Sequence, residues 1–254
     1  MKALLESVEE YWRQRADGYC QVNLEELDSF KRRAWTDLIN EYAPRISGKR
    51  LRVLDIGTGP GFFAIIMAAC GYEVTAIDYT ETMLQKAKNN AGIYRNAIHF
   101  ERMDAHNLKF EENTFDLIVT RNLTWNLERP DMAYREWHRV LAQGGRLLNF
   151  DANWYLHVHD AEKRKAYEQD RVNCAERGFA DHYIHTDTEA MEEIARKLPL
   201  SKEHRPEWDV KELRKIGFGK IMIVKEIGSS VWDEEEIVNY GSTPMFMVCA
   251  EKSK

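Results

Sequence analysis

The sequence predicts an α/β fold in which a parallel sheet carries helices on both faces, and two observations support this prediction. From residue 51 to about residue 152, short apolar runs alternate with segments that have helical spacing. A glycine-rich turn, Gly57-Thr58-Gly59-Pro60-Gly61, follows the first apolar run. Strands that alternate with helices form a parallel sheet, because each helix carries the chain back across the sheet before the next strand pairs.

The elements follow one another in a regular order. Residues 1–46 have apolar side chains at helical spacing, and Asp17-Gly18 predicts a break between two helices there. Thr80 can cap the helix that follows the second strand, and Gly92 ends that helix. Gly144-Gly145 turns the chain into the fifth strand. The predicted strands cover residues 51–56, 73–78, 97–104, 114–120 and 146–152, and the predicted helices cover residues 61–70, 81–91 and 131–141.

The alternation stops after Trp154. Residues 155–205 are polar and helical in character, so we expect a helical lid inserted late in the fold. A short helix and two strands, at 220–227 and 243–251, then close the chain. We expect a single domain over residues 1–254, with N-terminal helices at 1–46, a core at 50–152, the lid at 155–205, and a helix and strand hairpin at 209–252.

The composition disfavours several classes of partner. The net charge of −6 disfavours a nucleic-acid partner, because binding phosphates needs a basic face. No run of 18 apolar residues predicts a membrane helix, and the acidic N-terminus lacks the apolar segment of a secretion signal. The four cysteines form no C-x-x-C pair. We therefore expect free thiols, a cytoplasmic location and no membrane association.

The glycine-rich turn indicates a ligand site. Glycine permits a positive φ and lets a ligand approach the backbone, and the next helix presents free N–H groups. The dinucleotide pattern G-x-G-x-x-G would need glycine at position 62, where this chain has Phe62. Asp55 precedes the turn and would repel a pyrophosphate, whereas it suits a cationic group such as the amine of an amino-acid cofactor. The alternative is a tight turn that binds nothing.

Two further aspartates follow the second and third strands. Asp78 lies 21 residues after Gly57, where a carboxylate can accept hydrogen bonds from ribose hydroxyls; otherwise it caps the next helix. Asp104 can accept from the exocyclic amine of adenine, with Met103 and Ala105 against the ring; otherwise it is a surface residue. Because the carboxyl ends of parallel strands meet at one edge of the sheet, we expect these aspartates to line one crevice with Asp55.

In this order, the motifs resemble those of class I S-adenosylmethionine-dependent methyltransferases. The resemblance rests on VLDIGTGPG, AIDYTETML, MDAHNL, TFDLIVTRN and AYREWHRVLAQGGRLL. Residues 136–145 also match the E-x-x-R-V-L-x-x-G-G signature of members that act on small molecules. The similarity is close over residues 50–152, and the last two strands match in outline.

The resemblance implies a Rossmann-like, seven-stranded sheet with an antiparallel last strand, and S-adenosylmethionine as cofactor. It also implies that aromatic residues of an N-terminal helical flap close over the cofactor, although these residues could equally serve helix packing. Asn122 would lie beneath the methyl donor. The cofactor-binding residues implied in this way are Tyr11, Trp12, Tyr19, Asp55, Gly57, Thr58, Gly59, Gly61, Asp78, Tyr79, Met83, Met103, Asp104, Ala105 and Asn122.

The acceptor side carries weaker signals. Asn122 is followed by Leu123-Thr124-Trp125 rather than by the two prolines and aromatic of enzymes that methylate adenine or glutamine, so that chemistry is disfavoured. Trp125 either stacks on the acceptor or is a buried aromatic. Asn153 and Trp154 are expected to border the acceptor. Tyr155 and His157 are the candidate catalytic groups.

A metal site is the alternative use of the histidines after the fifth strand. His-x-His and His-x-x-His are workable ligand spacings. Clustered histidines without paired cysteines are more often part of a polar lid, so no metal is predicted. The alternative site would use His157, His159, Cys174, His182 and His185.

The predicted function is methyl transfer from S-adenosylmethionine to a small molecule by in-line substitution, which yields S-adenosylhomocysteine. Two alternatives stay open: a nicotinamide-dependent oxidoreductase and a non-catalytic module that binds S-adenosylmethionine. No feature of the sequence identifies the acceptor, the methylated atom, the pathway or the oligomeric state.

Overall fold

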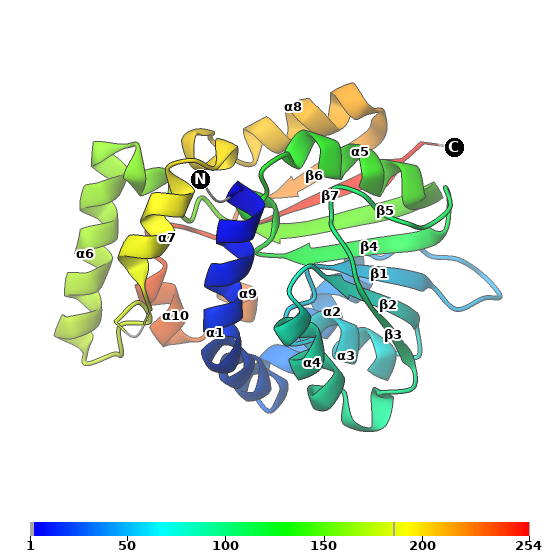
Figure 1. Cartoon of the computed structure of the whole chain (residues 1–254), viewed down its shortest axis with the longest axis horizontal. Helices are drawn as coiled ribbons and strands as arrows, with labels where there is room; N and C mark the ends of the chain where they lie inside the picture. Colours follow the sequence, from blue (N-terminus) through cyan, green and yellow to red (C-terminus); the bar gives the residue numbers. More distant parts are fainter. Residues whose placement is uncertain (1–2, 185, 254) are drawn as a thin grey trace.

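The computed structural model describes residues 3–184 and 186–253, and its centre is a seven-stranded sheet (Figure 1). The strand order is β3-β2-β1-β4-β5-β7-β6, and β7 runs antiparallel to both of its neighbours. The predicted Rossmann-like sheet with an antiparallel last strand is therefore confirmed. The strands are β1 (Arg52–Ile56), β2 (Glu73–Asp78), β3 (Ile98–Arg102), β4 (Phe115–Arg121), β5 (Leu141–Asp151), β6 (Phe218–Val224) and β7 (Phe246–Lys252).

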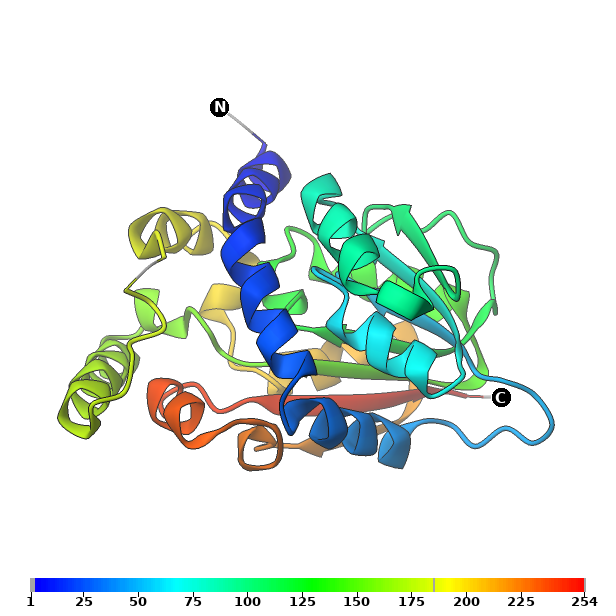
Figure 2. The ribbon, with the colours of Figure 1, turned by 90° about the horizontal axis from the view of Figure 1, so that it is seen from below.

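Helices cover both faces of the sheet, as Figures 1 and 2 show. One face carries α2 (Lys31–Tyr42), α3 (Phe62–Ala69) and α4 (Glu81–Asn90), and the other carries α5 (Pro130–Val140) and α8 (Glu207–Ile216). A separate apolar cluster fills the space on each face. None of the described helices has both the length and the apolar character needed to cross a bilayer.

The N-terminal helices divide at a different place from the one predicted. α1 (Leu4–Leu27) runs without interruption through Gly18, and the break lies at residues 28–30. A glycine inside a helix costs only about 1 kcal/mol relative to alanine, which the packing of α1 against α4 and other helices offsets. Ser29 makes the actual break, because its hydroxyl donates to the carbonyl of Glu26 and accepts from the N–H of Lys31.

Strand β5 begins earlier than predicted, before Gly144-Gly145 rather than after it. The register with β4 shifts between the pairs Phe115–Leu141 and Leu117–Arg146, so the two glycines occupy an irregularity in the strand pair. A Cβ on Gly145 would lie 2.9 Å from the carbonyl oxygen of Asp116. Glycine is therefore required for this close backbone approach.

The predicted lid region is helical. It contains α6 (Ala161–Arg177) and α7 (Thr188–Ala195), and α7 packs against α1. The predicted C-terminal strands do pair, but two short helices, α9 (Gly228–Val231) and α10 (Glu234–Asn239), separate them. A capping box between Asp233 and Glu236 starts α10, and this D-x-x-E signal was present in the sequence.

Candidate functional site

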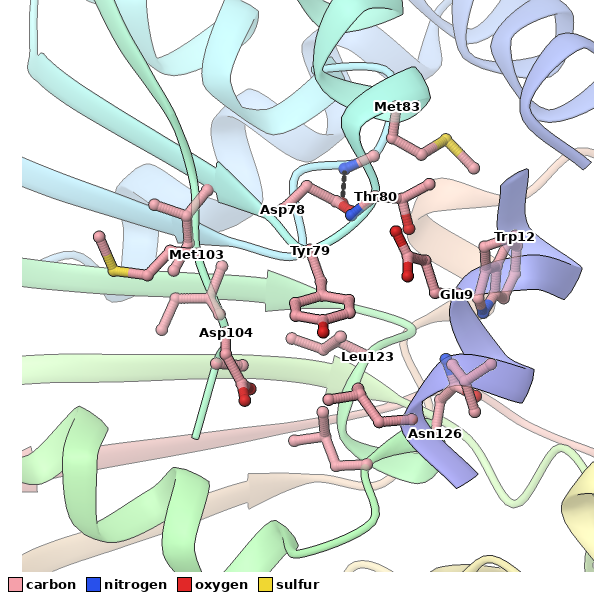
Figure 3. A pocket seen from close by; sticks show the side chains of 18 of the residues that line it. Glu9, Trp12, Asp78, Tyr79, Thr80, Met83, Met103, Asp104, Leu123 and Asn126 are labelled. Atoms are coloured by element: carbon pink, nitrogen blue, oxygen red, sulfur yellow. Dashed lines mark hydrogen bonds between the residues drawn. The ribbon is translucent and has the colours of Figure 1, made fainter. Parts of the chain in front are cut away.

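A cavity with about 880 Å³ of empty space, part of it open to solvent, lies at the carboxyl ends of β1, β2 and β4 (Figure 3). We call it the main cavity. Helix α1 forms its far wall through residues such as Glu9 and Trp12. The predicted residues that line it are Trp12, Tyr19, Gly57, Gly59, Asp78, Tyr79, Met83, Met103, Asp104, Ala105 and Asn122.

The glycine-rich turn serves two purposes. Gly57 and Gly59 line the main cavity with φ values of 69° and 53°, and the N–H of Gly57 donates to the carbonyl of Ile77 at 2.9 Å. Gly61 has a φ of 97° and is not among the residues that line this cavity. A Cβ on Gly61 would lie 3.0 Å from the Cβ of Ala87, so this glycine allows α3 to approach α4 closely.

Asp78 points toward the main cavity from the end of β2 (Figure 3). Its two oxygens accept hydrogen bonds from the N–H groups of Gly59 and Thr80, each at 2.8 Å. Burial raises the pKa of Asp78 to about 6, and the backbone hydrogen bonds oppose that rise. A carboxylate has roughly four lone-pair sites, so about two remain for a ligand.

Asp104 lies two residues beyond the end of β3, in the turn that follows it. Its Oδ1 accepts from the backbone N–H of His106 at 2.9 Å and lies 2.6 Å from Nδ1 of the same residue. His106 also lines the main cavity, and sequence analysis missed it. This pairing orients the Asp104 carboxylate at the end of the cavity opposite α1.

Two buried polar atoms in the main cavity point to a ligand. Nε1 of Trp12 and Oδ1 of Asn126 are shielded from solvent and have no hydrogen-bond partner within the described part of the chain. Both residues line the main cavity. Because an unpaired buried polar group costs about 1–3 kcal/mol, a ligand that bonded to these atoms would gain from doing so. Sequence analysis did not single out Asn126.

Asp55 and Thr58 lie in a smaller pocket beside the main cavity, which we call the inner pocket. Oδ2 of Asp55 accepts from the hydroxyl of Thr58 at 2.6 Å and from the N–H of Ala64 at 3.0 Å. The residues that line the inner pocket are Tyr19, Asn23, Asp55, Gly57, Thr58, Phe62, Phe63 and Arg121.

Arg121 is the cation of the inner pocket, and sequence analysis missed it. Its guanidinium forms a two-pronged ion pair with Glu26 at 2.8 Å and lies 4.8 Å from the ring centre of Phe62. Burial alone would lower the pKa of Arg121, but the carboxylate of Glu26 outweighs that effect and holds the pKa above its usual value. The pocket therefore presents a carboxylate and a permanent guanidinium side by side.

Asp55 gives the unliganded protein a specific pH dependence. Burial raises the pKa of Asp55 to about 7, although Thr58, Ala64 and Arg121 oppose the rise. Between about pH 4 and pH 7 the folded protein holds a proton that the unfolded chain has released, so the free energy of unfolding falls as pH rises. Asp55→Asn removes this titration. We therefore expect the difference in unfolding free energy between the variant and the native chain to change in favour of the variant by on the order of 1–3 kcal/mol from pH 5 to pH 8.

Urea unfolding of both proteins at pH 5, 6.5 and 8 measures this effect. The comparison isolates Asp55, because the histidines with lowered pKa values contribute equally to both proteins. A stability difference that stays constant over this range would show that Asp55 titrates normally.

Asn122 joins the main cavity to a second one. Its backbone is left-handed, with a φ of 55°, which is uncommon outside glycine. Its carbonyl accepts from Nε1 of Trp125 at 2.9 Å, and its Oδ1 accepts from Nε1 of Trp154 at 3.2 Å. Two tryptophans thus hold Asn122 in this conformation at the boundary between the cavities.

The second cavity has mainly aromatic walls, and we call it the aromatic cavity. Trp125 stacks on Tyr155 with ring centres 4.9 Å apart, so its ring is both buried and part of the wall. The residues that line the aromatic cavity are Tyr11, Trp12, Arg15, Tyr19, Asn122, Trp125, Trp154, Tyr155, His182, Tyr183, Thr186, Met191 and Tyr240.

The two candidate catalytic residues occupy different positions. Tyr155 lines the aromatic cavity, but burial raises its pKa well above 10, so at neutral pH it is a phenol and not a base. His157 is buried against Tyr167, with ring centres 4.3 Å apart, and its Nε2 lies 3.2 Å from Glu192. It is absent from the walls of both the main and the aromatic cavity.

Asn153 anchors the chain rather than facing the aromatic cavity. Its side-chain amide exchanges two hydrogen bonds with the backbone of Arg205, at 2.8 and 3.1 Å. The alternative metal site has no support in the described residues, where no group of three or more potential metal ligands occurs. His182 is paired with Tyr240 and Glu235, and His185 lies outside the described residues.

Comparison with known proteins relates the core to one family. Residues 54–149 match the family model described as "Methyltransferase domain". The chain is 33% identical over 118 residues to the ubiquinone/menaquinone biosynthesis C-methyltransferase UbiE of Cereibacter sphaeroides, and 34% identical over 119 residues to the demethylmenaquinone methyltransferase of Thermus thermophilus. These matches cover 46% of this chain, and 47% and 51% of the two relatives, so the chain spans about half the length of the relatives it matches.

Solved structures share the fold at low sequence identity. A phosphoethanolamine N-methyltransferase of Haemonchus contortus aligns with a TM-score of 0.60 and 16% identity, over 87% of this chain and 52% of that one. The [4+2]-cyclase SpnF aligns with a TM-score of 0.55 and 19% identity, over 86% of this chain and 80% of that one. Because one of these neighbours is a cyclase, the fold by itself does not identify the reaction.

Proposed function

We propose that this chain, which carries a class I S-adenosylmethionine-dependent methyltransferase domain, transfers a methyl group from S-adenosylmethionine to a small-molecule acceptor. One observation carries the proposal. The main cavity extends from Asp104 past Asp78 to Asn122, where it meets the aromatic cavity. A donor site and an acceptor site would then share a boundary at Asn122, and methyl transfer requires this arrangement.

The residues of the main cavity suit an adenosyl group. Asp78 would accept hydrogen bonds from the two ribose hydroxyls, and Asp104 would accept from the adenine amine, with Met103 and Ala105 beside the ring. Asn126 Oδ1 and Trp12 Nε1 are one acceptor and one donor that a bound molecule can satisfy. Asp55, which lines the inner pocket, suits the ammonium group of the methionine portion.

Bound S-adenosylmethionine would supply an activated methyl group for a lone pair of the acceptor, with the neutral thioether of S-adenosylhomocysteine as the leaving group. The chain's own task is therefore positioning and the exclusion of water. In this proposal, donor and acceptor meet at Asn122, whose left-handed backbone is held by hydrogen bonds from two tryptophans. α1 would cover the donor from one side.

Isothermal titration of the chain with S-adenosylmethionine, S-adenosylhomocysteine and NAD tests the proposal. We expect micromolar binding of the two adenosyl ligands and no binding of NAD. Phe62 stands where the dinucleotide pattern needs a glycine, and the carboxylate of Asp55 would repel a pyrophosphate. Binding of NAD alone would support the oxidoreductase. Adenosyl binding with no methyl transfer to any small molecule in a broad screen would support the non-catalytic module.

The state of the cysteines supports a cytoplasmic location for this activity. Cys20, Cys70, Cys174 and Cys249 are free thiols, and three of them are buried. Buried, unpaired thiols are typical of proteins kept in a reducing compartment.

A further inference from the structure

We infer that the acceptor is a flat aromatic molecule that carries an anionic group, with its ring in the aromatic cavity and its anionic group at Arg15. This inference rests on the proposed function, since it names the class of molecule that would receive the methyl group. Three features of the aromatic cavity support it: its walls, its charges and its separation from the donor's polar contacts.

The walls favour a ring. Eight of the residues that line the cavity are aromatic: Tyr11, Trp12, Tyr19, Trp125, Trp154, Tyr155, Tyr183 and Tyr240. They come from α1, from the loop after β4, from the segment after β5, from the segment before α7 and from the end of α10. Flat rings arranged in this way bind another flat ring through offset stacking and edge contacts. A flexible, fully polar molecule would leave these surfaces poorly covered.

The charges favour an anion. Arg15, on α1, is half-buried, and within the described part of the chain it has no hydrogen-bond or ion-pair partner. None of the described residues that line the cavity is an aspartate or a glutamate. The nearby Glu235 is bonded to Nε2 of His182, at 2.8 Å. A guanidinium without a carboxylate partner suits a carboxylate or phosphate, which it can bind through two parallel hydrogen bonds.

An amine would fit the same cavity less well. Aromatic faces do attract cations, but Arg15 would repel an ammonium group placed beside it. The tyrosine hydroxyls cannot compensate, because burial raises the pKa values of Tyr155 and Tyr240 well above 10 and keeps both groups neutral. Among the described residues, the walls of the cavity therefore carry one guanidinium and no carboxylate.

Arg15 is also separate from the donor's expected contacts. It is not among the residues that line the main cavity or the inner pocket. The inner pocket has its own cation in Arg121. This geometry therefore assigns Arg15 to a carboxylate on the acceptor. It does not assign Arg15 to the carboxylate of the donor's methionine portion.

The test compares matched acids and amines on the same ring. The first pair is phenylacetate and phenethylamine, and the second is indole-3-acetate and tryptamine. Each compound is titrated into the protein saturated with S-adenosylhomocysteine, and saturation-transfer NMR gives its affinity. We expect each acid to bind at least five-fold more tightly than its amine. Arg15→Gln should weaken the acids roughly ten-fold and leave the amines unchanged, since a hydrogen-bonded charge is lost. Arg15→Lys should restore part of the affinity.

The controls separate this inference from the proposed function. Arg13 lies on the same helix and is already paired with Glu10. Arg13→Gln should therefore not change the preference for acids over amines. Equal or tighter binding of the amines, or an acid preference that survives Arg15→Gln, would overturn the inference. So would loss of S-adenosylhomocysteine affinity in Arg15→Gln with acid binding intact. If S-adenosylhomocysteine does not bind the native chain, the proposed function itself fails; if it binds and no aromatic probe does, only the inference fails.

Discussion

Arg205→Gln is expected to lower the free energy of unfolding by about 3–5 kcal/mol, because it leaves two buried carboxylates without their cation. The guanidinium of Arg205 is inaccessible to solvent, as are the side chains of Asp151 and Asp209. Its nitrogens contact Asp151 at 2.5 Å and both oxygens of Asp209 at 2.8 and 2.9 Å. An amide side chain is shorter and neutral, so it cannot replace these contacts.

The same network supports the boundary of the two cavities. Asp151 accepts from the backbone N–H of Trp125 at 2.9 Å. Asn149 accepts from the hydroxyl of Thr124 at 3.1 Å and donates to the hydroxyl of Tyr134, which in turn bonds to Asp209. Loss of Arg205 is thus expected to loosen the loop that carries Asn122 and Trp125, as well as the sheet beneath it.

Urea unfolding at pH 7.5 measures the effect, with Arg33→Gln as the control. Arg33 forms an ion pair with Asp37 on the surface of α2, where both side chains are largely exposed. Exposed pairs of this kind contribute at most about 1 kcal/mol, so the control should be nearly neutral. A loss below about 1 kcal/mol in Arg205→Gln would mean that water or another side chain replaces the guanidinium.

The sheet and the residues at the ends of its first strands were predictable because their signals are local. Each strand and the helix after it occupy a short stretch of sequence, and the order of these units fixes a parallel sheet. Gly57, Gly59 and Asp78 act within the turns that follow single strands, so their positions follow from the fold. The structure accordingly brings them together in the main cavity.

The remaining features depend on contacts between distant parts of the chain. Arg121 and Glu26 are separated by 95 positions, and neither belongs to a recognisable pattern. The aromatic cavity combines residues from five separate segments, so no single stretch of sequence reveals it. His157 stood out because it follows β5, yet the chain turns there and its ring packs against α6 and α7 instead. Gly18 illustrates the opposite error, since tertiary packing overrides a local preference for a helix break.

Asp78→Asn is expected to weaken the binding of S-adenosylhomocysteine roughly thirty-fold, a loss of about 2 kcal/mol. In the proposed complex the carboxylate accepts hydrogen bonds from both ribose hydroxyls, and an amide can accept from only one of them. Its remaining oxygen must also serve the N–H groups of Gly59 and Thr80, which bond to the carboxylate in the unliganded protein. Titration calorimetry measures the loss directly.

Stability should move in the opposite direction from affinity. Burial raises the pKa of Asp78 to about 6, which means that the folded, unliganded protein disfavours the ionised carboxylate. At pH 8 that charge lowers the free energy of unfolding, since the unfolded chain ionises at lower pH. The neutral amide removes this cost, but it leaves one of the N–H groups of Gly59 and Thr80 without an acceptor. The removal of the charge is the larger effect at pH 8, so thermal unfolding of the unliganded variant should occur at about the same temperature as that of the native chain or at a higher one.

Opposite signs of these two effects would identify Asp78 as a residue kept for binding. Asp37→Asn, at an exposed position on α2, is the control and should change neither quantity. If Asp78 served only to cap the next helix, its replacement would lower the unfolding temperature and leave affinity nearly unchanged. A carboxylate that costs stability when empty and contributes affinity when occupied is what a ribose site at the end of β2 requires.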